Sequence, residues 1–285
     1  MADQDRSPEE LLVDKPAPDD QRLYSVTTII GALDKPALLY WAAEESAKAA
    51  VAVAKSLLVR VEEDGAEEVV KWLRDARFRK PKGQRSAKDL GTAVHDALEQ
   101  LALTGKFPDV DDEVRPFIVQ ADRWMQKFQP VYEAAEMTIY NPTYGYAGTL
   151  DAIATVEGVR FLLDYKSTRK SIDSRGKKTT PYPEQVGLQL AAYRYGEYAA
   201  AWRPRRYEYQ KRRYYLLGMT ERENAQPVPE VDSCLVLHLT PEHCDAFPIN
   251  ADEDAYQSFL YVLESYRWVN QTSRHIMGDP LEKEG

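Results

Sequence analysis

Residues Tyr144 to Thr168 read YGYAGTLDAIATVEGVRFLLDYKST, a pattern typical of a β-hairpin closed by a tight turn at Glu157-Gly158. Asp151 lies on the first strand, and the apolar end of the second strand runs directly into Asp164 and Lys166. Buried strands disfavour ionisable groups unless these groups are paired or bind a metal. The hairpin therefore predicts a site at its strand ends.

A metal-dependent phosphodiesterase site explains this placement of charge. Two neighbouring carboxylates, Asp151 and Asp164, repel each other and attract a cation, and Mg²⁺ prefers such oxygen ligands. The backbone carbonyl of Tyr165 would be a further ligand. Lys166 shares a strand face with Asp164, where it would orient or deprotonate the attacking water. The alternative interpretation is a buried Asp–Lys ion pair with a purely structural role.

Composition and length are those of a globular protein. The chain has 285 residues, of which 44% are hydrophobic and 29% charged. No apolar run approaches the ~18 residues needed to span a bilayer, and the acidic N-terminus resembles neither a signal nor a transit peptide. We expect a cytoplasmic protein with no membrane partner and a flexible arm over residues 1–21. Cys234 and Cys244 are too few for a four-cysteine zinc or iron–sulfur site and are expected to be free thiols.

The charge is unevenly distributed along the chain. The net charge of −9 argues against a nonspecific nucleic-acid binder. Residues 74–88, 167–178 and 203–213 are nevertheless strongly basic. Basic patches on an acidic body suit an enzyme that holds DNA and then releases it, although each patch alone is equally consistent with solvated loops and helix faces.

Helical periodicity dominates the first half of the chain, and β-periodicity dominates the second. We expect helices over 37–58, 66–77, 86–105, 111–128, 183–202 and 251–269. We expect strands over 136–140, 145–156, 159–167, 212–217 and 233–238. This order predicts an α/β (α+β) fold with a central mixed β-sheet flanked by helices and a helical N-terminal half. One domain is expected over 22–285, with a mainly helical part (22–130), a sheet-containing part (131–270) and a tail (271–285).

Two of the expected helices carry further polar candidates. His95 ends the motif GTAVH, and Gln189 and Tyr193 are four residues apart, so they share one helix face. A lone histidine on an apolar helix face is more often a core residue than a ligand. A Gln–Tyr pair at this spacing is more often packing with a surface hydrogen bond.

Four motifs occur in a fixed order along the chain. They are GxxxH at Gly91–His95, GxxD at Gly148–Asp151, DxK at Asp164–Lys166 and QxxxY at Gln189–Tyr193. Each motif alone is weak, but the series resembles the RecB-like branch of the PD-(D/E)XK nuclease superfamily, which includes many phage exonucleases. The resemblance implies a restriction-endonuclease-like core and a Mg²⁺-dependent DNA exonuclease, a deoxyribonuclease of phage or bacterial DNA recombination or repair.

The same resemblance implies a role for each matching residue. The metal ligands that it implies are the side chains of His95, Asp151 and Asp164 and the backbone carbonyl of Tyr165. Mn²⁺ is expected to substitute for Mg²⁺. Lys166 would be the catalytic lysine, and Gln189 and Tyr193 would line the catalytic site. Glu136, on the strand before the hairpin, is a possible additional acidic group.

The chain departs from the family pattern in two places. Leu150 stands where the family has a proline before the first aspartate. The four cysteines of the iron–sulfur relatives are missing, so we expect a phage-type member without a cluster. Because the Asp–Asp–Lys set is complete, an enzyme is favoured over the alternative, a non-catalytic DNA-end-binding or recombination scaffold protein that retains the nuclease fold.

DNA is the expected partner, and basic side chains near the site would hold its phosphates. The candidates are Arg79, Lys80, Lys82, Arg85, Arg169, Lys170, Lys177 and Lys178. No P-loop occurs, so any helicase motor would be a separate protein. By family analogy, a single-strand annealing protein is a plausible partner, and a phage-encoded enzyme would act in the host cytoplasm.

Overall fold

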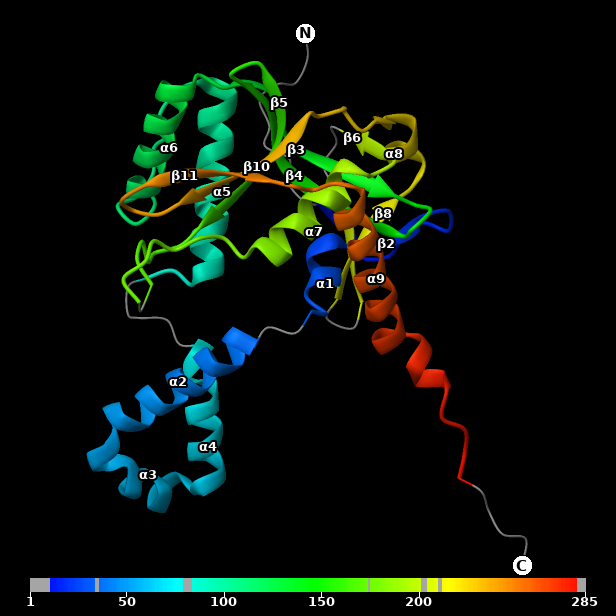
Figure 1. The fold of residues 1–285 in the computed structure, drawn as a ribbon. Helices are drawn as coiled ribbons and strands as arrows, with labels where there is room; N and C mark the ends of the chain where they lie inside the picture. The colour runs from blue at the N-terminus through cyan, green and yellow to red at the C-terminus, as the bar shows by residue number, and fades with distance from the viewer. Residues whose placement is uncertain are drawn as a thin grey trace, which may run out of the picture. The chain divides into compact units, whose positions relative to one another are not determined.

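The computed structural model describes residues 11–33, 36–78, 84–173, 175–200, 204–209 and 212–280. The chain divides into two compact units, one over Leu33–Asp89 and one formed by Met1–Ala32 with Leu90–Gly285. Both units were expected to belong to one domain over 22–285. The candidate site residues from His95 to Tyr193 all belong to the larger unit, most of whose elements are labelled in Figure 1.

The smaller unit is helical. It contains α2 (Pro36–Ala52), α3 (Leu57–Asp64) and α4 (Ala66–Arg74). The guanidinium of Arg60 lies 5.1 Å from the ring centroid of Trp72 and links α3 to α4. Cation–π contacts of this kind stabilise a surface helix pair modestly.

The single helix predicted over 37–58 is wrong. The structure ends α2 at Ala52 and begins α3 at Leu57. Val53 has φ −114° and ψ 17°, which is outside the helical region. A short 3₁₀ turn, Ala54–Ser56, connects the two helices. Alanine-rich composition predicts helix without specifying where tertiary packing bends it.

The larger unit is built on one mixed sheet with the strand order β1-β7-β8-β2-β4-β3-β6-β9, in which β5 also pairs with β4, and β10 and β11 extend the sheet beyond β5. The strands of the first half are β1 (Leu11–Leu12), β2 (Gln21–Ser25), β3 (Val131–Asn141), β4 (Tyr146–Val156) and β5 (Val159–Ser167). Those of the second half are β6 (Tyr198–Ala200), β7 (Arg205–Tyr209), β8 (Arg212–Leu217), β9 (Gln226–Pro227), β10 (Ser233–Leu239) and β11 (Cys244–Ile249). The predicted α/β class with a mixed sheet is confirmed.

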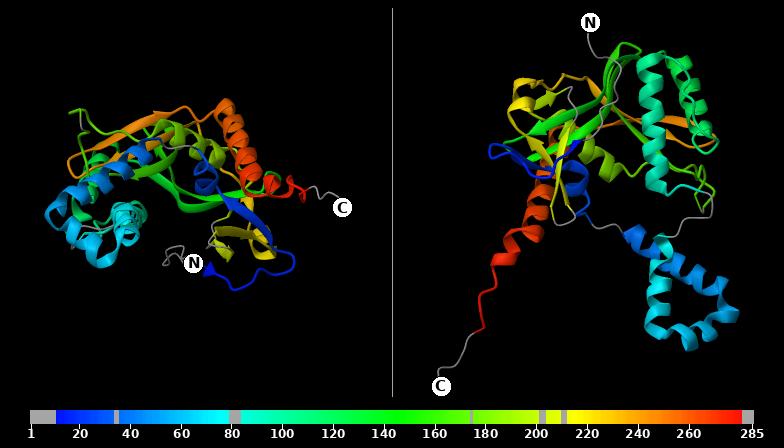
Figure 2. Two further views of the ribbon diagram at one scale, coloured as in Figure 1. Left: turned by 90° about the horizontal axis from the view of Figure 1, so that it is seen from below. Right: turned by 180° about the vertical axis from the view of Figure 1, so that it is seen from behind.

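Helices cover both faces of this sheet. On one face, α5 (Ala87–Thr104) and α6 (Arg115–Phe128) lie side by side (Figure 2, right) and share a core with Leu163 and Tyr165 of β5. The intervening residue, Asp164, is bonded from the opposite face by a side chain of α7 (Pro183–Arg194). The two helix layers therefore lie on opposite faces, as strand alternation requires.

The layer around α7 includes two further helices. Both α1 (Val26–Ile30) and α9 (Glu253–Asn270) pack against α7 and against each other. A short helix, α8 (Met219–Glu223), follows β8. Buried apolar side chains such as Ile29 and Phe259 fill this layer. The layer holds α7 against the strands that carry the candidate site.

The predicted hairpin is confirmed. Glu157 and Gly158 have φ values of 49° and 81°, the left-handed pair that a two-residue type I′ turn requires. The register pairs Val156 with Val159 and Ala152 with Leu163. This turn fixes the alignment of the two strands up to the candidate site.

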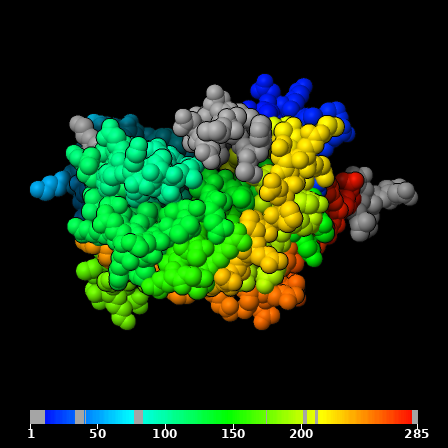
Figure 3. All heavy atoms as spheres, turned by 90° about the horizontal axis from the view of Figure 1, so that it is seen from above, coloured from blue at the N-terminus to red at the C-terminus, as the bar shows by residue number. Residues whose placement is uncertain are grey.

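The N-terminal segment differs from the flexible arm expected over residues 1–21. Residues 1–10 lie outside the described part of the chain, but Leu11–Leu12 pair in parallel with β7. The carboxylate of Asp20 lies 2.6 Å from the guanidinium of Arg205, and its side chain is 3% exposed. Figure 3 shows these N-terminal residues (blue) next to the segment around β7 and β8 (yellow). A buried ion pair and strand pairing therefore attach the second half of this segment to the sheet.

The helix predicted over 183–202 is too long, and its last two residues, 201 and 202, lie outside the described part of the chain. Helix α7 ends at Arg194, and Tyr198–Ala200 form β6 against β3. The reason is close packing at Gly196, where a Cβ atom would lie 2.1 Å from Ile139 Cγ2. Tertiary contact with the sheet, rather than local propensity, ends the helix.

We expect Gly196→Ala to lower the free energy of unfolding by about 1–3 kcal/mol, because overpacking forces neighbouring atoms apart. The matched control is Gly187→Ala within α7, where an added Cβ meets nothing within 4 Å. That change should raise stability by up to about 1 kcal/mol through helix propensity. Urea unfolding of the two variants measures both effects, and equal stability of the two would contradict this account of the helix end.

Cys234 and Cys244 are both free thiols, as predicted. Among the described residues, no helix combines the length and the apolar composition needed to cross a membrane.

Candidate functional site

The candidate site lies where β4 changes neighbours. On one edge, β4 pairs with β2 at Tyr146 and Ala147, and from Ala152 onward it pairs with β5. Asp151 lies in the interval between these two pairings. A strand that leaves one neighbour and joins another exposes side chains at the point of separation, so the topology itself makes room for a site there.

The hairpin register brings the two predicted aspartates together. Since Ala152 pairs with Leu163, the next position places Asp151 opposite Asp164. One oxygen of Asp151 accepts a hydrogen bond of 2.6 Å from the backbone N–H of Tyr165. This bond fixes the Asp151 carboxylate at the end of the second strand.

Asp164 and Lys166 form a close ion pair. The ammonium nitrogen lies 2.7 Å and 2.6 Å from the two carboxylate oxygens. The Asp164 side chain is 2% exposed, whereas that of Lys166 is 34% exposed. Burial raises the pKa of Asp164, although the ammonium opposes this shift. Burial lowers the pKa of Lys166, but the Asp164 carboxylate outweighs it and raises the pKa overall, so Lys166 is a cation at neutral pH.

Helix α7 supplies the predicted Gln189 and Tyr193. The Gln189 side-chain amide donates to Asp164 over 3.0 Å, and its oxygen accepts from Lys166 over 3.3 Å. The same amide lies 3.4 Å from the Tyr193 hydroxyl. The Tyr193 ring packs on Gly148, where a Cβ atom would lie only 2.5 Å from the ring. The glycine of the GxxD motif therefore makes room for the tyrosine of the QxxxY motif.

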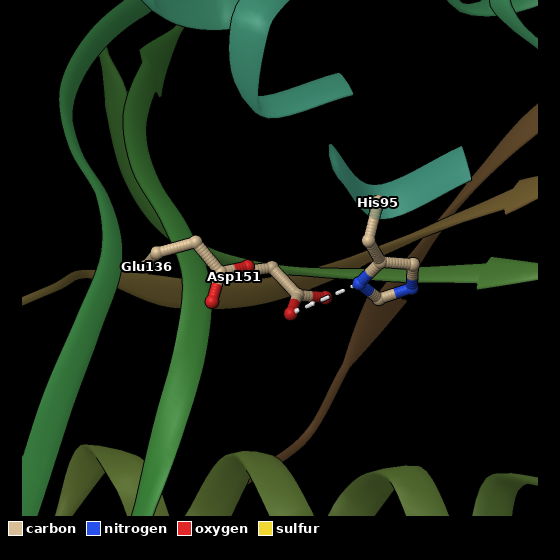
Figure 4. A group of neighbouring side chains, drawn as sticks. All are labelled: His95, Glu136 and Asp151. Atoms are coloured by element: carbon tan, nitrogen blue, oxygen red, sulfur yellow. Dashed lines mark ion pairs between the residues drawn. The ribbon is translucent and has the colours of Figure 1, made fainter. Parts of the chain in front are cut away.

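Helix α5 brings His95 to the other side of the site. Its Nδ1 atom lies 3.4 Å from an Asp151 oxygen, and the side chain is 27% exposed (Figure 4). The ring of Tyr165 packs edge-on against the imidazole, with 5.9 Å between the centroids. His95 faces a carboxylate, so the interpretation as an apolar core histidine is wrong.

Glu136 completes a group with His95 and Asp151. The strand pairs Ala135–Ala152 and Met137–Leu150 place Glu136 opposite Asp151. One ligand atom from each of the three side chains lies within 4.8 Å of the others (Figure 4). Ligands bound at about 2.0–2.6 Å around a divalent cation lie within about 5 Å of each other. The three donors therefore lie close enough together to be ligands of one metal ion.

The protonation of this group follows from its surroundings. Burial disfavours a charged His95, but the Asp151 carboxylate outweighs it and raises the pKa of His95 to about 9. Burial likewise opposes ionisation of Asp151, but the charge of His95 outweighs it and lowers the pKa of Asp151. Burial and the nearby Asp151 raise the pKa of Glu136 to about 8. In the metal-free protein at pH 7, His95 and Glu136 therefore hold protons that a metal ion would displace.

Metal binding should tighten as the pH rises. Below pH 8, His95 and Glu136 are both protonated, and the binding of the ion displaces one proton from each. The affinity for Mn²⁺ should therefore rise up to about a hundredfold per pH unit. Between pH 8 and 9, only His95 still carries its proton, and the dependence should fall to about tenfold per unit. Calorimetric titration in buffers of different ionisation enthalpy measures the protons released. Glu136→Gln should remove one of them, and an affinity independent of pH would contradict this ligand set.

Sequence reasoning missed two acidic neighbours of Glu136, Glu99 and Asp96. The charge of Glu99 contributes to the raised pKa of Glu136, and burial raises the pKa of Glu99 itself. The signal was present in the sequence, because Glu99 follows His95 by four residues and so shares its helix face.

The predicted DNA-contact residues are more dispersed than the site. Arg79, Lys80 and Lys82 lie outside the described residues, and Arg85 belongs to the smaller unit. Arg169 lies 2.5 Å from Glu113, and Lys178 lies 3.2 Å from Asp245, so both form ion pairs within the chain. Lys170 and Lys177 are exposed on the loop that follows β5.

The role of the Tyr165 backbone carbonyl as a metal ligand stays a prediction.

Comparisons with known proteins assign no family to this chain. No protein-family model matches it, and no curated protein matches it significantly. Among solved structures, the crystal structure of SSO0001 is similar over 68% of this chain and 80% of that chain, with 14% identity and a TM-score of 0.30. A likeness at this level carries no argument about function.

Proposed function

We propose that this chain is a metal-dependent DNA exonuclease of the RecB-like branch of the PD-(D/E)XK superfamily, of the phage type without an iron–sulfur cluster. The observation that carries the proposal is the meeting of Asp151, Asp164 and Lys166 with His95 and Gln189 at the point where β4 and β5 separate. Residues of four sequence motifs, from four separate elements, converge there. A purely structural Asp–Lys pair would not require His95 or Glu136 beside it.

The donor set suits a hard divalent cation. Side chains of His95, Glu136 and Asp151 would hold Mg²⁺ or Mn²⁺, with Asp164 and the Tyr165 carbonyl as the further ligands that the family resemblance implies. A bound ion of this kind lowers the pKa of water and neutralises charge that develops on a phosphate. The protons on His95 and Glu136 leave when the metal binds, which couples activity to pH.

Lys166 would act as a cation in this site. Because Asp164 raises the pKa of Lys166, the ammonium keeps its proton at neutral pH. Its place beside Asp164 and Gln189 suits it to orient the attacking water and to stabilise negative charge on the scissile phosphate. Gln189 fixes the ammonium by accepting from it while donating to Asp164. Of the two roles predicted for Lys166, this charge favours orientation over proton abstraction.

The proposal extends to substrate and surroundings. Exposed Lys170 and Lys177 follow the strand of Asp164 directly and would hold the phosphate backbone. A role in phage or bacterial recombination or repair, a single-strand annealing partner and a location in the host cytoplasm are proposed by family analogy alone.

Digestion of end-labelled oligonucleotides tests the proposal directly. Single- and double-stranded substrates labelled at the 5′ or 3′ end are incubated with protein in Mg²⁺, Mn²⁺ or EDTA. We expect stepwise shortening that requires the metal, no cleavage of circular controls, and no activity of Asp164→Ala. Cleavage by Asp164→Ala at the wild-type rate would contradict a catalytic role for this site. Binding of DNA ends without hydrolysis in either metal would favour the non-catalytic scaffold instead.

A further inference from the structure

Tyrosine and arginine side chains cover one face of the ribbon formed by β2, β8 and β7. Tyr214 pairs with both Tyr24 and Tyr207, and Tyr209 pairs with Arg212. Residues that pair in register share a face of the sheet, and Arg22 joins them because it lies two residues before Tyr24. The same rule adds Arg205 and Leu216 at one end of this face. We call the remaining part the tyrosine–arginine face, and it consists of Arg22, Tyr24, Tyr207, Tyr209, Arg212 and Tyr214.

The opposite face of the same ribbon is ordinary core. Leu23, Tyr215 and Leu217 are buried there in one hydrophobic cluster. Glu208 also lies on that opposite face, where it forms an ion pair of 3.5 Å with Arg213. The core therefore accounts for one face of the ribbon. Helix α9 covers the inner end of the other face, where Tyr266 packs against Tyr24 and Asn270 accepts a hydrogen bond from Arg212. The outer end, with Arg22, Tyr207 and Tyr209, is left to be explained.

The tyrosine–arginine face is open to solvent at its outer end. Tyr209 is 48% exposed, and its ring lies nearly parallel to that of Tyr207, with 6.3 Å between centroids and 12° between planes. The exposed Arg22 places its guanidinium 4.8 Å from the Tyr207 ring centroid. At the inner end, Tyr24 packs against Tyr214, with 5.4 Å between the centroids. Neighbouring rings and the guanidinium thus form a continuous patch.

The charge of this face selects an anionic ligand. Besides Arg205, which is paired with Asp20 and Glu221, this face carries Arg22 and Arg212, on a chain whose net charge is −9. Among the described residues, neither Arg22 nor Arg212 forms an ion pair, and Arg212 instead donates to the side-chain oxygen of Asn270 over 2.7 Å. A polyanion would therefore meet two arginines that no acidic side chain of the described residues neutralises.

The exposed rings specify the form of that polyanion. Aromatic faces stack on unpaired bases, whereas the bases of a duplex already stack on each other and present only their edges. Arginine guanidinium groups beside such rings contact the phosphates and add cation–π attraction. Single-stranded DNA satisfies both requirements.

The ribbon is joined to the strand that carries Asp151. Strand β2 pairs with β4 at Tyr146 and Ala147, and β8 lies beside β2 (Figure 1). The hydroxyl of Tyr215 lies 3.2 Å from the Thr149 hydroxyl, two residues before Asp151. A strand bound on this face would therefore lie on the same sheet as the candidate site.

We propose that the tyrosine–arginine face binds single-stranded DNA, with bases stacked on Tyr207 and Tyr209 and phosphates held by Arg22 and Arg212. This inference rests on the proposed function, because it names the form of DNA that the nuclease holds. It adds an interaction surface outside the four motifs.

Fluorescence anisotropy in EDTA tests the surface without hydrolysis. The probes are a labelled thymidine oligonucleotide and a blunt duplex of equal length. We expect Tyr207→Ala/Tyr209→Ala to weaken single-strand binding about five- to a hundredfold and to leave duplex binding within about twofold of wild type. Arg22→Gln should lower the number of phosphate contacts, as given by the salt dependence of single-strand binding, by roughly one. Tyr261→Ala, which removes a tyrosine that is 73% exposed on α9, is the matched control and should bind as wild type.

The outcomes separate the two proposals. Wild-type single-strand affinity of Tyr207→Ala/Tyr209→Ala, with an unchanged thermal unfolding midpoint, would overturn the surface while leaving the nuclease proposal intact. Equal losses of affinity for single-stranded and duplex DNA would overturn the preference of this surface for unpaired DNA. Conversely, selective single-strand binding by a wild-type protein that hydrolyses no DNA would overturn the nuclease proposal and support the surface. If the double variant unfolds, two further variants test the surface. Tyr207→Phe/Tyr209→Phe retains stacking and should bind single-stranded DNA as wild type does, whereas Tyr209→Ala alone should lose affinity for single-stranded DNA selectively. These two results together would support the surface.

Discussion

Lys166→Met is expected to lower the rate of DNA hydrolysis about a thousandfold without unfolding the protein. The lysine ammonium lies 2.6 Å from Asp164 and 3.3 Å from the Gln189 oxygen, so its loss removes the positive charge at the centre of the site. Without it, burial raises the pKa of Asp164 further, and that carboxyl takes up a proton instead of remaining an unpaired charge. Proton uptake limits the loss of stability, because a neutral carboxyl tolerates burial better than a carboxylate.

Two controls give this result its meaning. Lys166→Arg keeps the charge, so its activity should lie between those of wild type and Lys166→Met. Mn²⁺ affinity should fall far less than the rate of hydrolysis in Lys166→Met, because Lys166 contributes no atom to the His95, Glu136 and Asp151 group and only the proton on Asp164 opposes the ion. Single-turnover rates with saturating DNA measure the chemical step. Hydrolysis by Lys166→Met within tenfold of wild type would reduce the Asp164–Lys166 pair to a structural ion pair.

The meeting of the two aspartates was predictable because it follows from local sequence. Glu157-Gly158 closes a two-residue turn, and such a turn fixes the register of the whole hairpin. From that register, Asp151 necessarily lies opposite Asp164, and strand alternation places Lys166 on the face of Asp164. No long-range information was needed for this part of the site.

Other features depend on contacts between distant segments, which one sequence does not reveal. Glu136 has a φ of 49°, a left-handed conformation that is uncommon for a non-glycine residue in a strand. Its sequence signals only a strand residue, so its approach to His95 was no more than a possibility. The end of α7 is likewise decided by Gly196 against Ile139, 57 residues earlier in the chain. The attachment of Asp20 to Arg205 is equally nonlocal, and there the sequence suggested a loose arm.

The smaller unit illustrates a third kind of limit. Its helices were expected from propensity, but propensity says nothing about which helices share a core. Leu33–Asp89 therefore appeared to be the beginning of the main domain, whereas contacts within this segment make it a compact unit of its own. Packing partners, rather than element types, define such a boundary.

Asp151→Asn is the second change with a large expected effect, and it acts on the metal rather than on the lysine. Asparagine keeps the shape of the side chain and still accepts the hydrogen bond from the Tyr165 N–H, which is 2.6 Å in the wild type. It loses the negative charge that raises the pKa of His95 despite the burial of that side chain. Mn²⁺ affinity should fall by more than about a hundredfold, and DNA hydrolysis by about a thousandfold or more.

The same variant carries a spectroscopic signature that loss of stability would not imitate. In metal-free wild type, the pKa of His95 is about 9, because Asp151 stabilises the imidazolium. Without that carboxylate, burial dominates and the pKa should fall toward or below the ordinary value of 6.5. Imidazole NMR titration measures it, and the spectrum of His95→Gln identifies the resonance among the four histidines. An unchanged His95 pKa together with wild-type Mn²⁺ affinity would place any metal site elsewhere, because both quantities depend on the same carboxylate.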